Sequence, residues 1–167
     1  MPPALEAPQA TATRLKRPLI KFLASGAYLG YLPIAPGTAG ALLGVVIARW
    51  LCIPLWTRAP AIFPLIFALA FVLACYVAGA AESIWGEHDS SHIVLDEVLG
   101  MIAALFLLPS GWLWTVAAFA LFRLFDILKP WPASSFDRMS GGAGVMLDDL
   151  AAGIYANLVL QIARRLL

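Results

Sequence analysis

Long runs of apolar residues, separated by short polar segments, occupy most of this chain. The runs cover residues 36–56, 60–81, 93–108, 112–128 and 145–166. A helix needs about 20 mostly apolar residues to cross a bilayer, and each run reaches or approaches that length. The pattern therefore predicts an all-α fold, a polytopic membrane helical bundle of about five transmembrane helices.

Two of the predicted spans are short. Residues 93–108 and 112–128 are joined by a tight reversal at Pro109-Ser110-Gly111. At 1.5 Å per residue, helices of this length reach only about 25 Å. We expect both to extend into the interface or to lie in a locally thinned membrane.

The N-terminal region differs from these runs. Leu19–Leu32 is apolar but short and contains glycines, so it predicts an interfacial or re-entrant helix, and whether it spans the membrane stays open. Residues 1–18 are polar and contain prolines, which predicts a disordered cytoplasmic tail before a single integral-membrane domain at 19–167. Pro36-Gly37-Thr38 predicts a turn into the first span with Thr38 as its N-cap.

The composition agrees with a membrane protein. Hydrophobic residues make up 62% of the 167 positions and charged residues 13%, against roughly 25% charged in a soluble domain. Cys52 and Cys75 each lie inside an apolar run, which favours small buried residues over a redox or zinc site.

The few charges gather in a small part of the chain. The stretch from Phe122 to Asp149 holds Arg123, Asp126, Lys129, Asp137, Arg138, Asp148 and Asp149. If the N-terminus is cytoplasmic, alternating spans place this stretch and the polar loop at 82–92 on the cytoplasmic side. The excess of basic residues on that side satisfies the positive-inside rule, and the acidic residues gather there as well.

The acidic residues lie at the starts of two predicted helices. Asp96 and Glu97 precede Gly100, and Asp148 and Asp149 precede a face of small residues, so each pair lies beside a predicted close helix contact. Converging carboxylates repel one another unless a cation or protons neutralise them. Oxygen ligands without cysteine suit a hard ion such as Mg²⁺, and nearby basic residues suit a phosphate group. The pattern favours phosphoryl chemistry at the membrane surface.

Other interpretations of these residues stay open at this point. Asp148 and Asp149 could cap a helix, and Arg123 with Asp126 could form an intrahelical ion pair. A cation transporter or channel could use the same carboxylates. That alternative predicts acids spread through the depth of the bilayer, whereas here they lie at one end of their helices.

Several motifs resemble bacterial phosphatidylglycerophosphatase A. The resemblance runs from about Phe22 to the C-terminus and rests on Ala35-Pro36-Gly37-Thr38, Ile93-Val94-Leu95-Asp96-Glu97 with Gly100, FRLFDILKPWP at 122–132, Phe136-Asp137-Arg138 and GGAGVMLDD at 141–149. It implies a Mg²⁺-dependent lipid phosphatase that converts phosphatidylglycerophosphate to phosphatidylglycerol in phospholipid biosynthesis. It also implies a multi-pass protein of the bacterial inner membrane, with the active site facing the cytoplasm and membrane lipids around it. We expect no nucleic-acid partner, and the oligomeric state stays open.

The resemblance also suggests a role for each residue. As metal ligands we expect Asp96, Glu97, Asp148 and Asp149. As catalytic carboxylates we expect Asp96, Glu97, Asp126 and Asp149. As groups that bind the substrate phosphate we expect Arg123, Lys129, Arg138 and Thr38. The nucleophile is either a water molecule deprotonated by one of the acids or, through an aspartyl phosphate, Asp96 or Asp149 itself.

Overall fold

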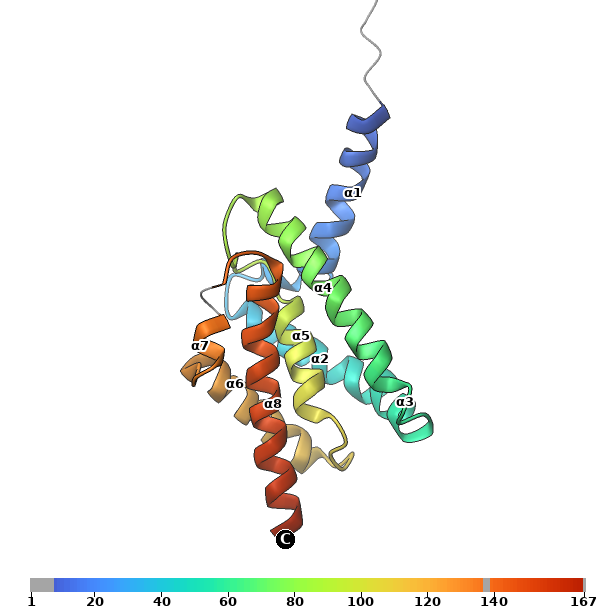
Figure 1. Ribbon diagram of the computed structural model, residues 1–167, viewed down its shortest axis with the longest axis vertical. Helices are drawn as coiled ribbons and strands as arrows, with labels where there is room; N and C mark the ends of the chain where they lie inside the picture. Colours follow the sequence, from blue (N-terminus) through green and yellow to red (C-terminus); the bar gives the residue numbers. More distant parts are fainter. Residues whose placement is uncertain (1–7, 137–138, 167) are drawn as a thin grey trace, which may run out of the picture.

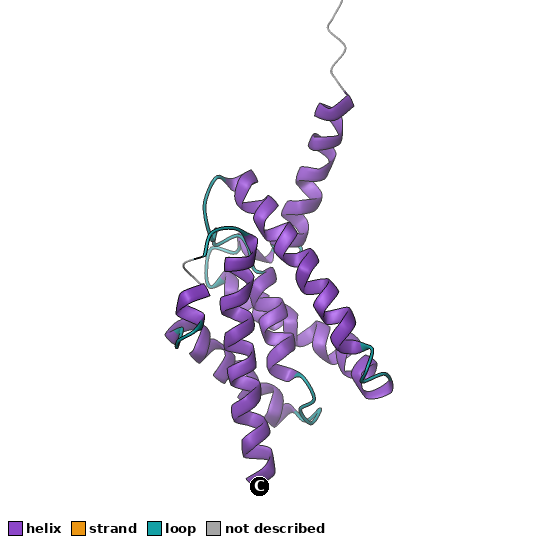
Figure 2. Ribbon diagram, in the orientation of Figure 1, coloured by secondary structure: helices purple, strands orange, loops and turns teal. Residues whose placement is uncertain are grey.

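The computed structural model describes residues 8–136 and 139–166, and in this part of the chain all regular structure is helical (Figure 1), with no strand (Figure 2). The helices are α1 (Pro8–Ala24), α2 (Pro36–Ile47), α3 (Ile53–Arg58), α4 (Phe63–Trp85), α5 (Leu95–Leu105), α6 (Trp112–Leu128), α7 (Ala133–Phe136) and α8 (Gly142–Leu166). A 3₁₀ turn precedes α2, and a π-helical turn joins α2 to α3. The predicted all-α class is confirmed.

Three stretches of the described chain are long and apolar enough to cross a membrane. They are Pro36–Arg58, Phe63–Trp85 and Gly142–Leu166. Each coincides with one of the predicted spans. The helices at the other two predicted positions are shorter, with 11 residues in α5 and 17 in α6. A membrane-spanning bundle is therefore supported, whereas the count of about five spans stays a prediction.

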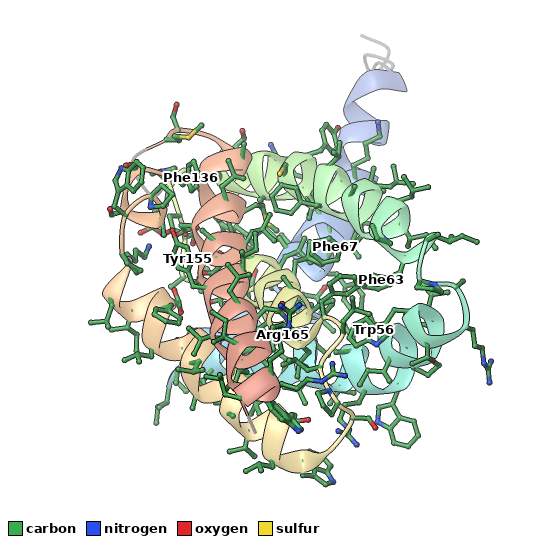
Figure 3. The ribbon with its side chains drawn as sticks, turned by 60° about the horizontal axis from the view of Figure 1, so that its bottom comes forward. Trp56, Phe63, Phe67, Phe136, Tyr155 and Arg165 are labelled. Carbon is green, nitrogen blue, oxygen red and sulfur yellow. The ribbon has the colours of Figure 1, made fainter. Side chains whose placement is uncertain are left out.

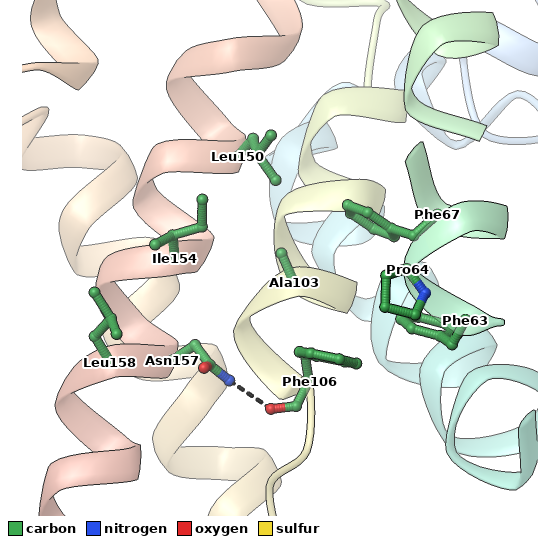
Figure 4. Close-up of a pocket in the computed structure, with 9 residues that line it drawn as sticks. All are labelled: Phe63, Pro64, Phe67, Ala103, Phe106, Leu150, Ile154, Asn157 and Leu158. Carbon is green, nitrogen blue, oxygen red and sulfur yellow. Dashed lines mark hydrogen bonds between the residues drawn. The ribbon is translucent and has the colours of Figure 1, made fainter. Parts of the chain in front are cut away.

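The helix α5 is shorter than the apolar run 93–108 because it ends inside the molecule. The amide of Asn157 on α8 donates hydrogen bonds to the backbone carbonyls of Ala104, at 3.0 Å, and Phe106, at 2.7 Å. Figure 4 shows the second of these bonds. Gln161 donates a third hydrogen bond, to the Phe106 carbonyl at 3.2 Å. Because α8 supplies these donors, carbonyls at the end of α5 are paired even though the helix stops within an apolar bundle.

The core is centred on α5, which lies between α2 and α8 (Figure 1). Most of its side chains are buried. Glycines allow the neighbouring backbones to approach closely: a Cβ at Gly100 would lie 2.7 Å from the backbone oxygen of Asp149 and from the ring of Phe122, and one at Gly44 would lie 2.8 Å from the oxygen of Val98. The predicted close helix contact at Gly100 is confirmed.

An aromatic cluster holds α3 and α4 against the end of α5. The ring centroids of Trp56 and Phe63 are 5.1 Å apart, and those of Trp56 and Phe106 are 5.6 Å apart. Figure 3 shows Trp56, Phe63 and Phe67 grouped on this side of the bundle. This packing fixes the C-terminal end of α5, which lies away from the acidic residues at the start of the helix.

The N-terminal region departs from the sequence-based expectation. A helix begins at Pro8, so residues 8–18, expected to be disordered, are helical. The segment Leu19–Leu32 is not one helix, because α1 ends at Ala24 and the chain turns through residues with positive φ before the 3₁₀ turn. The backbone of Val94 donates a hydrogen bond to the Ala24 carbonyl at 2.9 Å, which anchors this turn beside the start of α5.

Candidate active site

A polar cavity of about 350 Å³ lies where the starts of α2, α5 and α8 meet the end of α6. In Figure 1 the starts of α5 and α8 lie in the upper half of the bundle, and the end of α6 lies at the left, beside α7. The cavity is lined by Ala35, Pro36, Gly37, Thr38, Asp89, Ser90, Ser91, Ile93, Asp96, Glu97, Arg123, Asp126, Lys129, Asp148 and Asp149. All predicted site residues within the described chain line this one cavity. Arg138, and Asp137 beside it, lie outside the described residues.

Three of the carboxylates converge. One oxygen from each of Asp96, Glu97 and Asp149 lies within 4.8 Å of the others, and we call these residues the acid cluster. Asp96 and Asp149 are buried. Asp149 reaches the other two because α8 packs on α5 through Gly100 and Gly153, where side chains would hold the helices apart.

The acid cluster has unused ligand capacity. Glu97 Oε2 and Asp149 Oδ2 are buried, with no hydrogen-bond partner among the described residues. Three carboxylates this close cannot all stay ionised without a proton or a cation between them. The donors are all oxygen, with no thiol or imidazole, and such a set suits a hard divalent cation such as Mg²⁺. The residues present therefore fit the metal that the resemblance implies.

Two basic residues face the cavity from the end of α6, and we call them the basic pair. Arg123 Nη1 lies 2.7 Å from Asp126 Oδ2, and Lys129 Nζ lies 2.7 Å from Asp148 Oδ2. The intrahelical ion pair of Arg123 and Asp126 is thus present, and it lies in the cavity rather than on a solvated surface. Both ion pairs line the cavity that also holds the acid cluster.

Asp148 and Asp149 occupy different positions despite being neighbours in sequence. Asp149 belongs to the acid cluster, whereas Asp148 holds the ammonium group of Lys129. Successive residues on a helix point about 100° apart, so α8 presents one carboxylate to α5 and the other to α6. Asp148 Oδ2 thus contacts Lys129, while its Oδ1 is buried without a partner among the described residues, and its expected role as a metal ligand stays a prediction.

The start of α2 contributes backbone groups to the cavity. The helix begins at Pro36 with Ala35 as its N-cap, so the expectation that Thr38 is the N-cap was wrong. Proline is favoured in the first helical turn, where its missing N–H costs nothing. Thr38 lies within that turn and lines the cavity. The partial positive charge of this helix end points to a site that accepts anions.

Gly37 explains how the acid cluster approaches that helix end. A Cβ at this position would collide with the carboxylate of Glu97 and would lie 3.4 Å from Nη1 of Arg123. The absence of a side chain therefore lets an acidic and a basic group meet at the first turn of α2.

The loop before α5 adds two residues that the sequence did not single out. Ser90 and Ser91 line the cavity, and the Ser90 hydroxyl is buried without a partner among the described residues. Asp89 has a positive φ, and its backbone N–H donates a hydrogen bond to Glu82 Oε1 at 3.1 Å. Serines in a polar loop give no periodic sequence signal, so their place in the wall of the cavity is seen only in the structure.

The two histidines lie away from the chemistry. His88 pairs with Glu82, and neither residue lines the cavity. His92 Nδ1 lies 3.1 Å from the Gly30 carbonyl, and its ring stacks on Tyr31 at 4.5 Å. Both side chains contact the loop before α5 or the N-terminal turn.

Comparisons with known proteins agree with the resemblance seen in the motifs. A protein of Bacteroides thetaiotaomicron with the provisional name phosphatidylinositol-3-phosphatase is 40% identical over 161 residues, which cover 90% of this chain and 98% of that protein. Phosphatidylglycerophosphatase A of Haemophilus influenzae is 43% identical over 143 residues, with 84% and 86% covered. The Escherichia coli protein of that name is 37% identical over 134 residues, with 79% and 76% covered.

No solved structure matches the chain. Residues 22–164 match the family described as phosphatidylglycerophosphatase A, a range that contains every residue of the polar cavity. Both the family match and the length shared with the relatives cover most of the chain. The chain therefore belongs to the phosphatidylglycerophosphatase A family.

Proposed function

We propose that this chain is a Mg²⁺-dependent phosphatase that hydrolyses phosphatidylglycerophosphate to phosphatidylglycerol and phosphate in phospholipid biosynthesis. The coarser class, a membrane lipid phosphatase, follows from family membership. The observation that carries the finer proposal is the juxtaposition of the acid cluster and the basic pair in one cavity. Hydrolysis of a phosphate monoester uses both groups, because cations neutralise the phosphate oxygens while carboxylates transfer protons or bind a metal.

The acid cluster would hold the metal. Asp96, Glu97 and Asp149 offer three converging oxygens, two of their atoms being buried without a partner among the described residues. When bound, Mg²⁺ would supply positive charge to the phosphate oxygens and act as a Lewis acid. Ala151, Ala152 and Gly153 follow on α8 and pack closely, so the helix that carries Asp149 has little freedom to move.

The basic pair would bind the terminal phosphate of the lipid. Asp126 holds the guanidinium of Arg123, and Asp148 holds the ammonium of Lys129, which fixes both cations before substrate arrives. The N–H groups at the start of α2 and the hydroxyl of Thr38 would complete the phosphate site. Arg138, which lies outside the described residues, stays in this proposal as a further phosphate ligand.

The nucleophile remains a choice between two chemistries. One is a water molecule that gives its proton to a carboxylate of the acid cluster, and the other is Asp96 or Asp149 acting through an aspartyl phosphate. Acid quenching during a single turnover separates them. Hydrolysis through an aspartyl phosphate passes through a phosphoenzyme that the quench traps, whereas direct attack by water forms none.

We place the cavity on the cytoplasmic side of the inner membrane as part of this proposal. Its support is the positive-inside rule: α1, with Lys16, Arg17 and Lys21, extends beyond the same end of the bundle as the cavity (Figure 1). Cysteine labelling of single-site variants in intact cells, at Lys16 and at Arg165, tests this orientation. Labelling of the Lys16 position from outside the cell would contradict it.

The test of the proposed reaction is phosphate release by the purified protein in mixed micelles. The names of the relatives point to different headgroups, so the substrates are phosphatidylglycerophosphate, phosphatidylinositol 3-phosphate and phosphatidic acid, each with Mg²⁺ or with EDTA. We expect the highest kcat/KM for phosphatidylglycerophosphate and no turnover in EDTA. Faster turnover of phosphatidylinositol 3-phosphate, or full activity in EDTA, would overturn the proposal.

A further inference from the structure

An apolar groove lies beside the polar cavity, between α6 and α8. It has a volume of about 330 Å³, and its lining includes Phe125, Trp131, Tyr155, Val159 and Ile162. Its outer wall is open, since Trp131 and Ile162 are largely exposed. In a protein that spans a membrane, such a surface faces the hydrocarbon of the bilayer.

The groove and the cavity share the end of α6. Phe125 of the groove precedes Asp126 of the cavity, and Trp131 follows Lys129 at a distance of two residues. The same helical turn therefore forms a wall of both spaces. A molecule with its phosphate on the basic pair has this groove as the neighbouring apolar surface.

The spacing along α8 gives the groove its direction. Asp148, Tyr155 and Ile162 follow one another at intervals of seven residues, which places them on one face of the helix. Seven residues correspond to about 10 Å along the axis. The face thus begins at the carboxylate that holds Lys129, passes the phenol of Tyr155 and continues as apolar surface.

Tyr155 carries the one hydroxyl among the groove's lining residues, and this hydroxyl is buried without a partner among the described residues. Its ring packs edge-on against Phe125, with centroids 5.8 Å apart. Figure 3 shows Tyr155 on the side of α8 that faces α7 and the end of α6. A buried phenol hydroxyl without a partner is unfavourable, so a polar atom that docks here would gain a hydrogen bond.

We propose that the groove holds an acyl chain of the lipid substrate, with the Tyr155 hydroxyl donating a hydrogen bond to the ester carbonyl at the top of that chain. The proposal rests on the proposed function, because it takes a phosphate-bearing diacyl lipid as the occupant. Such a lipid carries, in order, a terminal phosphate, a glycerol and phosphodiester linker, an ester and a hydrocarbon chain. The groups that would contact these parts of the lipid follow along α8 in the same order: the Lys129–Asp148 pair, the phenol of Tyr155 and an apolar wall.

A matched pair of variants tests the groove. Val159 lines it and is 42% exposed; Ile154 is 45% exposed on the same helix but lines a different apolar pocket, with Phe67, Phe106 and Asn157, shown in Figure 4. Val159→Trp would fill the proposed chain site, whereas Ile154→Trp places the same bulk away from it.

The kinetic readout is kcat/KM for long-chain and short-chain diacyl forms of phosphatidylglycerophosphate in mixed micelles. We expect Val159→Trp to lower the ratio of long-chain to short-chain kcat/KM by at least about tenfold, the lower end of what a steric change in an apolar pocket costs. Ile154→Trp should leave the ratio within about twofold of wild type, since it lies outside the groove.

An unchanged ratio in Val159→Trp would overturn the proposal. Equal loss on both substrates would do the same, including loss accompanied by a change in sedimentation, which would mean that a second copy covers the groove.

The hydrogen bond has a separate test in the isosteric variant Tyr155→Phe. With the ester-linked substrate we expect kcat/KM to fall by about two- to tenfold, the range for one neutral hydrogen bond. With an ether-linked analogue, which has no carbonyl to accept the bond, the variant should match wild type. The same loss on both lipids would overturn this contact. If the wild-type protein hydrolyses neither lipid, the proposed function itself fails. If the wild-type protein is active but the groove does not distinguish its substrates, only the groove proposal fails.

Discussion

Lys129 Nζ lies 2.7 Å from Asp148 Oδ2, and this ion pair ties the end of α6 to the second turn of α8. The two residues are 19 positions apart in sequence. Through this pairing Asp148 contacts the ammonium group that, in the proposed function, meets the phosphate.

The ion pair predicts strong coupling between the two residues. We expect Lys129→Met and Asp148→Asn each to lower kcat/KM, and the double variant to be little worse than the worse single one, because the second change removes a partner that has already been lost. A double-mutant cycle on kcat/KM measures this coupling, expected at about 0.5–3 kcal/mol for groups in contact. Additive losses would mean that Asp148 acts independently, for example as the metal ligand expected from the sequence.

Gly100 sets the distance between α5 and α8. A Cβ there would lie 2.7 Å from the backbone oxygen of Asp149, so Gly100→Ala should push α8 away and disturb the acid cluster. We expect a loss of roughly 1–3 kcal/mol of stability, as for other overpacked cores, together with lower activity. Thermal unfolding in detergent and phosphate release measure the two effects.

The control for this prediction is Gly111→Ala. Its added Cβ would meet Trp114 at 3.7 Å, an ordinary contact, and the φ of Gly111 is −69°. It should leave stability and activity near the wild-type values. If Gly100→Ala behaves like Gly111→Ala, the close contact does not position Asp149.

Asn157 caps the buried end of α5. Asn157→Leu keeps the side-chain size but removes the donor to the carbonyls of Ala104 and Phe106. We expect a loss of about 1–3 kcal/mol, the cost of a buried polar group left unpaired, seen as a lower unfolding temperature in detergent. Thr57→Val is the control, since the exposed Thr57 hydroxyl bonds to carbonyls of its own helix. Equal stability of the two variants would contradict the capping role.

The sequence predicted most of the helix positions because apolar runs and turn residues act locally. The first, second and fifth predicted spans match long apolar helices. The span at 93–108 was predicted to be short, but the end of α5 at Leu105 was not predicted, because the side chains that pair its end carbonyls, Asn157 and Gln161, are far away in sequence. The position of the α2 N-cap was also missed, since Ala35 has no side chain that marks a cap.

The site could be predicted in outline for a similar reason. Asp96, Glu97 and Asp149 stood out as charges at the starts of apolar helices, and the fold brings them together. The separate placement of Asp148 and the contribution of Ser90 depend on which helix each side chain faces. Spacing along one segment does not carry that information, because it is set by packing between helices.

The most direct test of the account is Mg²⁺-dependent phosphate release from phosphatidylglycerophosphate by Asp149→Asn and Glu97→Gln. Both variants keep the side-chain shape and remove one charge from the acid cluster. The control is Glu87→Gln, an exposed acid that does not line the cavity. We predict that each cluster variant loses at least about hundredfold in kcat, the scale at which removal of one electrostatic stabiliser is felt, while it unfolds at the wild-type temperature or above and Glu87→Gln stays active. Wild-type turnover by both cluster variants would contradict the central claim that these carboxylates form the catalytic centre.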